Sequence, residues 1–373
     1  MRIDYIINSM EGGGAQTPVP RIVRALEAAG AQVRVLALTR RNGLAIERLR
    51  AAGVDLVIRD GGEADHLAAL KWLRRQARAR GTQALWTSLT RATLLGQIVG
   101  QQLGLPVVSW QHNAYLRPAN ERLLRWRAGK SALWIADSQQ VAQLTLTRLK
   151  VPPDRLVTWP IFAADPSVPQ AQEWAPGTPI VIGSLGRLHP NKGYDVLINA
   201  IAWMKRQATT PLPQFLVIIG GTGQDEADLR AQADSAGVAE VELAGFVTDP
   251  HRFLATLHLY VQPSLREGFC VAAHEAMQAG LPVIVSAVGE MPFTVDESVG
   301  KTVPPGDITA LAAALTQMLA HPQQLSGMGK AARARVFGKF PPEAFDATAS
   351  HIVSRLRALL ERYGKPLSRV STP

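Results

Sequence analysis

Short apolar runs alternate with longer helix-like segments along nearly the whole chain, and no other feature restricts the possible folds as strongly. A chain that repeats strand and helix in this way forms parallel sheets covered by helices, so we predict the α/β class. The predicted strands in the first half are 2–8, 33–38, 54–58, 84–87, 106–110, 132–136 and 157–160. Those in the second half are the run that opens at 180 and the runs 215–220, 241–243 and 257–262.

The alternation is interrupted between residues 161 and 178, where Pro166, Pro169 and Pro176 stand in a stretch of little periodicity. Aperiodic, proline-containing stretches are typical of linkers. With 373 residues the chain is long enough for two domains with separate cores. We therefore predict one α/β domain before this stretch and a second one after it.

Two carboxylates, Glu267 and Glu275, stand close together in the second half. Glu267 falls in a glycine-containing loop after a predicted strand, and Glu275 falls in the helix that follows. The amides of residues 268–270 lie at the start of that helix, where free backbone donors and the helix dipole favour an anion. A phosphate at the helix start, with neutral hydroxyls at the two carboxylates, fits a nucleotide sugar.

Two further loops carry residues suited to a phosphorylated ligand. Gly186, Arg187 and Lys192 follow the strand that opens at 180, and two cations in one strand–helix loop suit a diphosphate. His112 follows the strand 106–110 directly, at the edge where ligands of open α/β sheets bind. A lone histidine is more often structural, but this position favours a site. Ser138, after the strand 132–136, is a good helix N-cap.

The basic excess of the chain lies in its first half. The net charge is +10, of which residues 1–164 carry +12 and residues 165–373 carry −2. Two predicted helices, 65–80 and 117–130, are rich in basic residues and hold Trp72 and Trp126. Basic helices with tryptophan are typical of membrane-surface elements. A nucleic acid, an anionic membrane, or simply solvated arginine-rich faces would each account for the excess.

The single cysteine excludes an internal disulfide and favours a reducing compartment. The N-terminus lacks the apolar core of a signal peptide, and no apolar run reaches the ~18 residues of a spanning helix. We expect a cytoplasmic protein, peripheral at the cytoplasmic face of the membrane.

These motifs resemble those of the retaining GT-B glycosyltransferases of family 4, and the similarity is strongest between residues 180 and 307. The signature E-x7-E reads here as Glu267 to Glu275, and two further elements of the family read as AGLPV at 279–283 and VPPGD at 303–307. The family's G-R-L and K-G elements match 186–188 and 192–193. One turn departs from the pattern, since the family's Gly-Gly-x-Pro-Glu ends here in Phe293.

The resemblance implies two Rossmann-like domains with parallel sheets facing across an interdomain cleft, residues 1–162 with the C-terminal helix at about 344–373, and residues 163–343. It implies catalytic roles for His112, Arg187, Lys192 and Glu267. It implies donor-binding roles for Gly13, Gly14, Gly186, Arg187, Lys192, Phe246, Val247, Glu267, Gly268, Phe269, Cys270, Val271 and Glu275.

Several individual roles follow from the same resemblance. Arg187 and Lys192 would stabilise the leaving diphosphate, so neither a metal nor another cofactor is implied. Glu267 would hold the sugar and Glu275 the ribose. Phe246 would border the nucleotide base, although it could equally belong to the core.

We therefore expect a retaining glycosyltransferase that moves a sugar from a UDP- or GDP-linked donor to a lipid-linked or cell-surface glycan, of lipopolysaccharide or exopolysaccharide type. Its partners would be the nucleotide sugar, the glycan or glycolipid acceptor and an anionic membrane surface, without nucleic acid. Two alternatives stay open. One is a GT-B sugar-nucleotide epimerase, and the other is a basic nucleic-acid-binding protein with a vestigial cleft.

Overall fold

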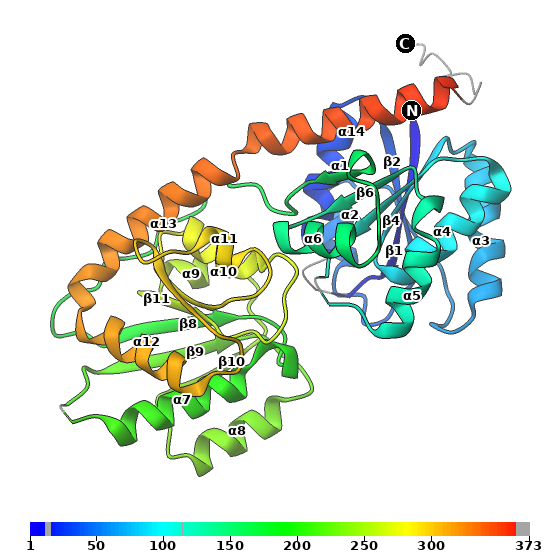
Figure 1. Cartoon of the computed structure of the whole chain (residues 1–373). Helices are drawn as coiled ribbons and strands as arrows, with labels where there is room; N and C mark the ends of the chain where they lie inside the picture. Colours follow the sequence, from blue (N-terminus) through cyan, green and yellow to red (C-terminus); the bar gives the residue numbers. More distant parts are fainter. Residues whose placement is uncertain (12–15, 114, 210, 363–373) are drawn as a thin grey trace. The chain divides into compact units, whose positions relative to one another are not determined.

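The computed structural model describes residues 1–11, 16–113, 115–209 and 211–362 (Figure 1). Gly13 and Gly14 lie outside these described residues. The chain divides into two compact units. The N-terminal unit comprises Met1–Ile161 and the segment from Pro342 onward, and the C-terminal unit comprises Phe162–Pro341.

The N-terminal unit is built on a seven-stranded parallel sheet in the order β3-β2-β1-β4-β5-β6-β7. Its strands are β1 (Arg2–Ser9), β2 (Gln32–Thr39), β3 (Leu56–Ile58), β4 (Ala84–Ser88), β5 (Val107–Gln111), β6 (Leu133–Ala136) and β7 (Leu156–Thr158). Its helices are α1 (Val19–Ala28), α2 (Ile46–Ala51), α3 (His66–Arg80), α4 (Thr90–Leu103), α5 (Pro118–Trp126), α6 (Gln139–Thr147) and α14 (Pro342–Arg362). Helices α3 and α4 pack on one face of the sheet.

The C-terminal unit is built on a six-stranded parallel sheet in the order β10-β9-β8-β11-β12-β13. Its strands are β8 (Ile180–Leu185), β9 (Phe215–Gly220), β10 (Val241–Gly245), β11 (Leu259–Gln262), β12 (Val283–Ser286) and β13 (Gly300–Val303). Its helices are α7 (Tyr194–Gln207), α8 (Glu226–Ser235), α9 (Pro250–Ala255), α10 (Val271–Gln278), α11 (Met291–Thr294), α12 (Ile308–Ala320) and α13 (Leu325–Lys339). The predicted α/β class with two Rossmann-like units is confirmed.

Helix α14 belongs to the N-terminal unit because its apolar stripe is buried there. Phe345 packs against Trp159 with ring centroids 4.8 Å apart, and Arg357 donates to the carbonyl oxygens of Ala29 and Gly30 after α1. The other buried residues of the helix recur at helical spacing, at Ala349, Ile352, Val353, Leu356 and Leu360. This stripe continues the aromatic core of Trp86, Trp110 and Trp159.

The strand order creates one ligand-binding position at the carboxyl edge of each sheet. The chain winds outward in one direction from β1 and in the other from β4, and the same reversal separates β8 from β11. Loops leaving the strands at such a reversal diverge, and ligands of open α/β sheets bind in the space between them. In the C-terminal unit these are the loops that follow β8 and β11.

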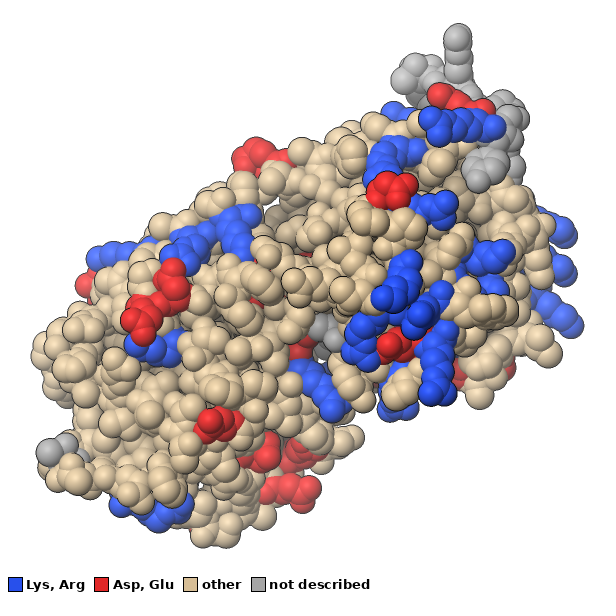
Figure 2. Space-filling view, in the orientation of Figure 1, with Lys and Arg blue, Asp and Glu red and all other residues tan. Residues whose placement is uncertain are grey.

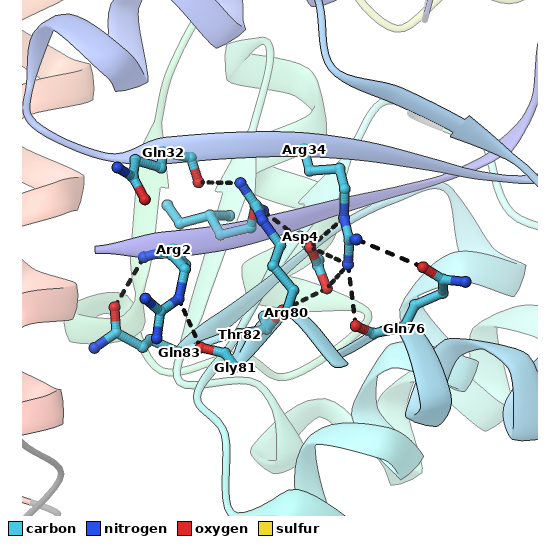
Figure 3. Close-up of polar contacts among 10 residues, drawn as sticks. Arg2, Asp4, Gln32, Arg34, Gln76, Arg80, Gly81, Thr82 and Gln83 are labelled. Carbon is cyan, nitrogen blue, oxygen red and sulfur yellow. Dashed lines mark hydrogen bonds and ion pairs between the residues drawn. The ribbon is translucent and has the colours of Figure 1, made fainter. Parts of the chain in front are cut away.

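At the opposite edge of the N-terminal sheet, a buried carboxylate holds β1, β2 and α3 together (Figure 3). Asp4 is fully buried, and Arg34 binds both of its oxygens at 3.1 Å. Arg80 donates to it at 3.0 Å and the Thr82 hydroxyl at 2.6 Å. A buried charge is tolerated only when it is paired and hydrogen-bonded in this way.

We predict that Asp4→Asn lowers the free energy of unfolding of the N-terminal unit by about 3 kcal/mol, because it leaves two guanidinium groups without their carboxylate. Unfolding in urea can be followed by tryptophan fluorescence, since Trp86, Trp110, Trp134 and Trp159 are all buried in this unit. The exposed Asp60 supplies the control, and Asp60→Asn should change the stability by less than about 0.5 kcal/mol. Equal effects of the two substitutions would contradict a structural role for the Asp4 cluster.

Candidate donor site of the C-terminal unit

The loop after β8 brings Lys192 to the carboxyl edge of the sheet. Lys192 ends a short 3₁₀ turn, η3 (Pro190–Lys192), in which the His189 ring accepts a hydrogen bond from the Asn191 amide at 3.1 Å. Gly193 then starts α7 with φ 67°, a left-handed conformation that favours glycine. A Cβ atom at this position would lie 2.2 Å from the Pro263 carbonyl oxygen. The loop therefore depends on glycine both for its backbone angle and for its close approach to the neighbouring loop.

Glu267, in the loop after β11, forms an ion pair with Lys192. The Lys192 ammonium donates to Glu267 Oε1 at 2.6 Å, and the Ser264 hydroxyl donates to the same oxygen at 2.7 Å. The Glu267 side chain is 13% exposed and that of Lys192 is 24% exposed. The structure thus brings together two residues that the sequence placed in separate motifs.

A series of buried hydrogen bonds connects Glu267 to the ends of strands β8 and β11. Gln262 donates to the Ser264 hydroxyl at 3.0 Å, and the Tyr260 hydroxyl donates to Gln262 at 2.7 Å. Tyr260 in turn accepts from the Leu185 amide at the end of β8, at 3.1 Å. These bonds connect the ends of two neighbouring strands, so Glu267 is held by the sheet itself.

The Lys192–Glu267 pair favours the charged form of the lysine. Burial is the largest single influence on the pKa of Lys192 and lowers it. The nearby Glu267 carboxylate, which also accepts a hydrogen bond from Lys192, is the main opposing influence, and the net result is a raised pKa. Arg187, in the same loop, is exposed. Within the described part of the chain, no carboxylate forms an ion pair with its guanidinium group. The site therefore offers one cation already paired with a carboxylate and one that is available for an anionic ligand.

The start of α10 supplies backbone donors beside this pair. Cys270 is the N-cap and has φ 72°, an uncommon angle for a residue with a side chain. The first backbone bond of the helix runs from the His274 amide to the Cys270 carbonyl at 3.4 Å, and the Ala273 amide is bonded to the Cys270 side chain. The amides before Ala273 have no backbone acceptor inside the helix. Burial raises the pKa of the Cys270 thiol, which disfavours the thiolate that a nucleophile would need.

The remaining predicted donor residues lie on the same edge of the sheet. Glu275 is half-buried on α10, a little more than one turn after Val271. Phe246 and Val247 follow β10, and Phe246 is 61% exposed. Phe246 is therefore not a core residue, and its ring is accessible to a planar ligand. Gly186 follows β8 directly and packs against the Lys192 side chain.

The turn that departs from the family pattern is tied to the end of the C-terminal unit. Gly289 approaches Gly268 so closely that a Cβ atom would lie 2.7 Å from the Gly268 carbonyl oxygen. Glu290 is buried and accepts a hydrogen bond from Lys339 at 2.9 Å. Phe293, where the family has glutamate, is 43% exposed. The buried carboxylate of this turn thus faces α13.

An aromatic cluster at the start of α10, beside the loop 263–270 (the donor loop), was not predicted from the sequence. Phe269 stacks on His274 with ring centroids 4.2 Å apart, and both rings contact Phe162 and Phe340. Burial lowers the pKa of His274 to about 3, so the ring is neutral. Phe162 and Phe340 lie at the two points where the chain enters and leaves this unit. No spacing rule relates Phe162 and Phe340 to the pair Phe269 and His274, because the three segments lie far apart in the sequence.

His112 lies at the carboxyl edge of the other sheet, immediately after β5. Its ring is hydrogen-bonded to Ser88 and to Asp137, which lie in the same way at the ends of the neighbouring strands β4 and β6. Ser138 caps α6 as predicted, since its hydroxyl accepts from the Val141 amide at 3.1 Å. Sequence reasoning assigned no site role to Ser88 or Asp137, although both stand at strand ends and could have been found by that rule.

The described residues contain no group of three or more histidine, cysteine, aspartate or glutamate side chains that could hold a metal ion. The expectation of a metal-independent site stays a prediction.

Comparisons with known proteins match both units. The family described as "Glycosyl transferases group 1" matches residues 169–335, and "Glycosyltransferase Family 4" matches residues 12–162. The chain belongs to glycosyltransferase family 4. The predicted resemblance is thereby confirmed, and the first of these two matches contains both Lys192 and Glu267.

Curated glycosyltransferases are similar to this chain over part of their length. The D-inositol 3-phosphate glycosyltransferase of Segniliparus rotundus is 32% identical over 48% of this chain and 40% of its own length. A GDP-mannose-dependent phosphatidylinositol monomannoside mannosyltransferase of Corynebacterium glutamicum is 27% identical over 57% and 60%. The amylovoran biosynthesis glycosyltransferase AmsK of Erwinia amylovora is 32% identical over 48% and 45%. The matched region thus spans about half the length of these relatives.

Solved structures show the same fold over nearly the whole chain. HepE of Anabaena, solved with UDP-glucose, aligns with a TM-score of 0.82 at 20% identity, covering 95% of this chain and 100% of the other. Sucrose-phosphate synthase of Thermosynechococcus elongatus aligns with a TM-score of 0.79 at 21% identity, covering 96% and 100%.

We predict that Gly193→Ala destabilises this family 4 protein by about 3 kcal/mol, from about 1 kcal/mol for the left-handed angle and about 2 kcal/mol for the collision with Pro263. Gly237→Ala is the matched control, because Gly237 has φ 66° and a Cβ atom added there would meet nothing within 4 Å. It should lose only the first contribution. Calorimetric unfolding measures both, and equal losses would show that the approach to Pro263 is not tight.

Proposed function

We propose that this protein is a retaining, metal-independent glycosyltransferase that uses a UDP- or GDP-linked sugar. The observation that carries the proposal is the Lys192–Glu267 ion pair at the ligand-binding edge of the C-terminal sheet, with the exposed Arg187 in the same loop as Lys192. Support for the nucleotide comes from HepE, solved with UDP-glucose, and from the GDP-mannose-dependent relative.

Each residue has a role that its position supports. Negative charge develops on the departing diphosphate as the glycosidic bond breaks, and Arg187, Lys192 and the α10 amides would stabilise it. Glu267 has one oxygen bound to Lys192 and Ser264, so its other oxygen can accept from a sugar hydroxyl or face the cationic sugar. Glu275 would hold the ribose, and Phe246 would lie against the base. The role of His112 toward the transferred sugar stays a prediction.

We predict that Arg187→Ala and Lys192→Ala each reduce turnover by roughly one to three orders of magnitude, the scale for losing one transition-state contact. Release of UDP or GDP from UDP-glucose, GDP-mannose and related donors, with a mixture of glycan acceptors, measures this. Arg206→Ala is the control, because Arg206 is also exposed but lies in the last turn of α7, which leads into the amino end of β9 at the other edge of the sheet. Turnover within twofold of wild type for both site variants would contradict the assignment.

We also propose that the acceptor is a lipid-linked or cell-surface glycan and that the N-terminal unit docks on an anionic membrane surface at the cytoplasmic face. On α5, Trp126 is 75% exposed and Leu123 is 40% exposed, and Arg122, Arg125 and Lys130 around them are exposed as well. Figure 2 shows basic side chains gathered over α5 and along α3. AmsK, named for amylovoran biosynthesis, supports a glycan of this class.

Only part of the predicted membrane surface is available. Trp72 is partly buried against the core between α3 and the sheet, and Arg80 is bound to Asp4. Both side chains therefore offer less surface than an interfacial helix would need, and a membrane role for α3 stays a prediction. Docking would depend on α5, aided by Lys71, Arg75 and Arg78 of α3, which are exposed. Among the described residues, no helix is long and apolar enough to cross a membrane.

We predict that Arg122→Gln with Arg125→Gln weakens binding to vesicles containing phosphatidylserine by about 2 kcal/mol, roughly thirtyfold, at ~1 kcal/mol for each basic residue. Trp126→Ala should weaken it further. Co-sedimentation at low and high salt measures this. Arg48→Gln with Arg50→Gln, on α2, removes the same charge elsewhere on the unit and should have a smaller effect. Equal effects of the two charge pairs would show that net charge, and not the α5 surface, governs binding.

A further inference from the structure

Three polar side chains form a hydrogen-bonded chain at the carboxyl edge of the N-terminal sheet. The Ser88 hydroxyl contacts His112 Nε2, and His112 Nδ1 lies 3.1 Å from Asp137 Oδ2. Ser88 and Asp137 are buried, and the His112 side chain is 6% exposed. The three residues end, or directly follow, the adjacent strands β4, β5 and β6, so the parallel pairing of the strands aligns them.

The residues around the Ser88–His112–Asp137 triplet restrict the orientation of the His112 ring. The His112 ring stacks on Trp110 with centroids 5.3 Å apart and an interplanar angle of 24°, and Trp110 stacks on Trp159 at 4.8 Å. Leu89, immediately after Ser88, has φ 76°, a strained angle that orients the junction between β4 and α4. Strain of this kind persists where the surrounding structure enforces it, often at functional sites.

A serine, histidine and aspartate in this order also occur in hydrolases, but the same chemistry does not apply here. Ser88 has no exposed surface, so no substrate carbonyl can approach its hydroxyl. The hydrogen-bond directions are nevertheless informative. An ionised carboxylate can only accept, so Nδ1 must carry the proton that faces Asp137. In the neutral ring Nε2 then has only a lone pair, which accepts the Ser88 hydroxyl proton.

We propose that Asp137 and Ser88 are positioning residues that hold His112 in the Nδ1–H tautomer and keep Nε2 as a hydrogen-bond acceptor. The inference rests on the proposed function in one respect, namely that a hydroxyl of the bound sugar replaces Ser88 as the hydrogen-bond donor to Nε2. An acceptor nitrogen binds a hydroxyl, which donates, and discriminates against phosphate or ether oxygens, which only accept. The Ser88 hydroxyl thus donates to Nε2 in the way that a sugar hydroxyl would.

The tautomer can be measured directly in the full chain. Protein labelled with ¹⁵N-histidine is studied by NMR at pH 8, above the ordinary histidine pKa of about 6.5, and the His112 signals are assigned with His112→Asn. We expect the Nδ1–H pattern in the wild type and in Ser88→Ala, and its loss in Asp137→Asn. Two controls should keep it: Ser109→Ala, which removes a buried hydroxyl bonded to Ser131, and Asp4→Asn, which removes a buried carboxylate at the opposite sheet edge.

An Nε2–H or doubly protonated ring in the wild type would overturn the inference, as would an unchanged tautomer in Asp137→Asn. Should Asp137→Asn fail to fold, the wild-type measurement decides by itself. This readout needs no substrate. A wild-type protein that turns over no donor would therefore contradict the proposed function and leave the tautomer result intact.

A second measurement tests whether the Nε2 position acts on the substrate. His112→Gln places an amide oxygen near the Nε2 position, whereas His112→Asn reaches only the Nδ1 position. With whichever of UDP-glucose or GDP-mannose is turned over, we expect the glutamine variant to keep at least tenfold more activity than the asparagine variant. Equal losses in the two variants, at equal thermal stability, would contradict the role of Nε2 as an acceptor.

Discussion

The candidate donor site depends on one ion pair, in which the Lys192 ammonium lies 2.6 Å from Glu267 Oε1. The two residues belong to the loops that leave β8 and β11, which are neighbours in the sheet but turn away from each other after their strands end. The pair closes the space between the loops. Because both side chains are largely buried, loss of either partner would leave an uncompensated charge, which is costlier than the loss of a surface pair.

Close backbone packing keeps the pair in place. Gly193 touches the Pro263 carbonyl, Gly289 touches the Gly268 carbonyl, and Cys270 takes a left-handed angle at the start of α10. Below them, Phe269 and His274 pack against Phe162 and Phe340, the residues at which the chain enters and leaves the C-terminal unit. The donor loop is thus supported both by the sheet and by the two ends of its unit.

The N-terminal unit holds two buried carboxylates with different surroundings. Asp4, near the amino end of β1, is saturated by two guanidinium groups and a hydroxyl, and has the character of a structural anchor. Asp137, just beyond the carboxyl end of β6, binds the ring of His112, which retains a small exposed edge. The direction of the strands separates these cases, because ligands reach parallel sheets from their carboxyl edge.

The sequence by itself determined the α/β class, the family and the loops that hold Arg187, Lys192, Glu267 and Glu275, since each depends on local periodicity or on residues near one another in the chain. Only the tertiary structure decided that Lys192 pairs with Glu267, that Phe246 is exposed and Trp72 is not, and that Ser88 and Asp137 bind His112. These facts depend on strand order and helix rotation. Strand order arises from packing between segments far apart in sequence, and a hydrophobic pattern shows which face of a helix is buried without showing which neighbour covers each side chain.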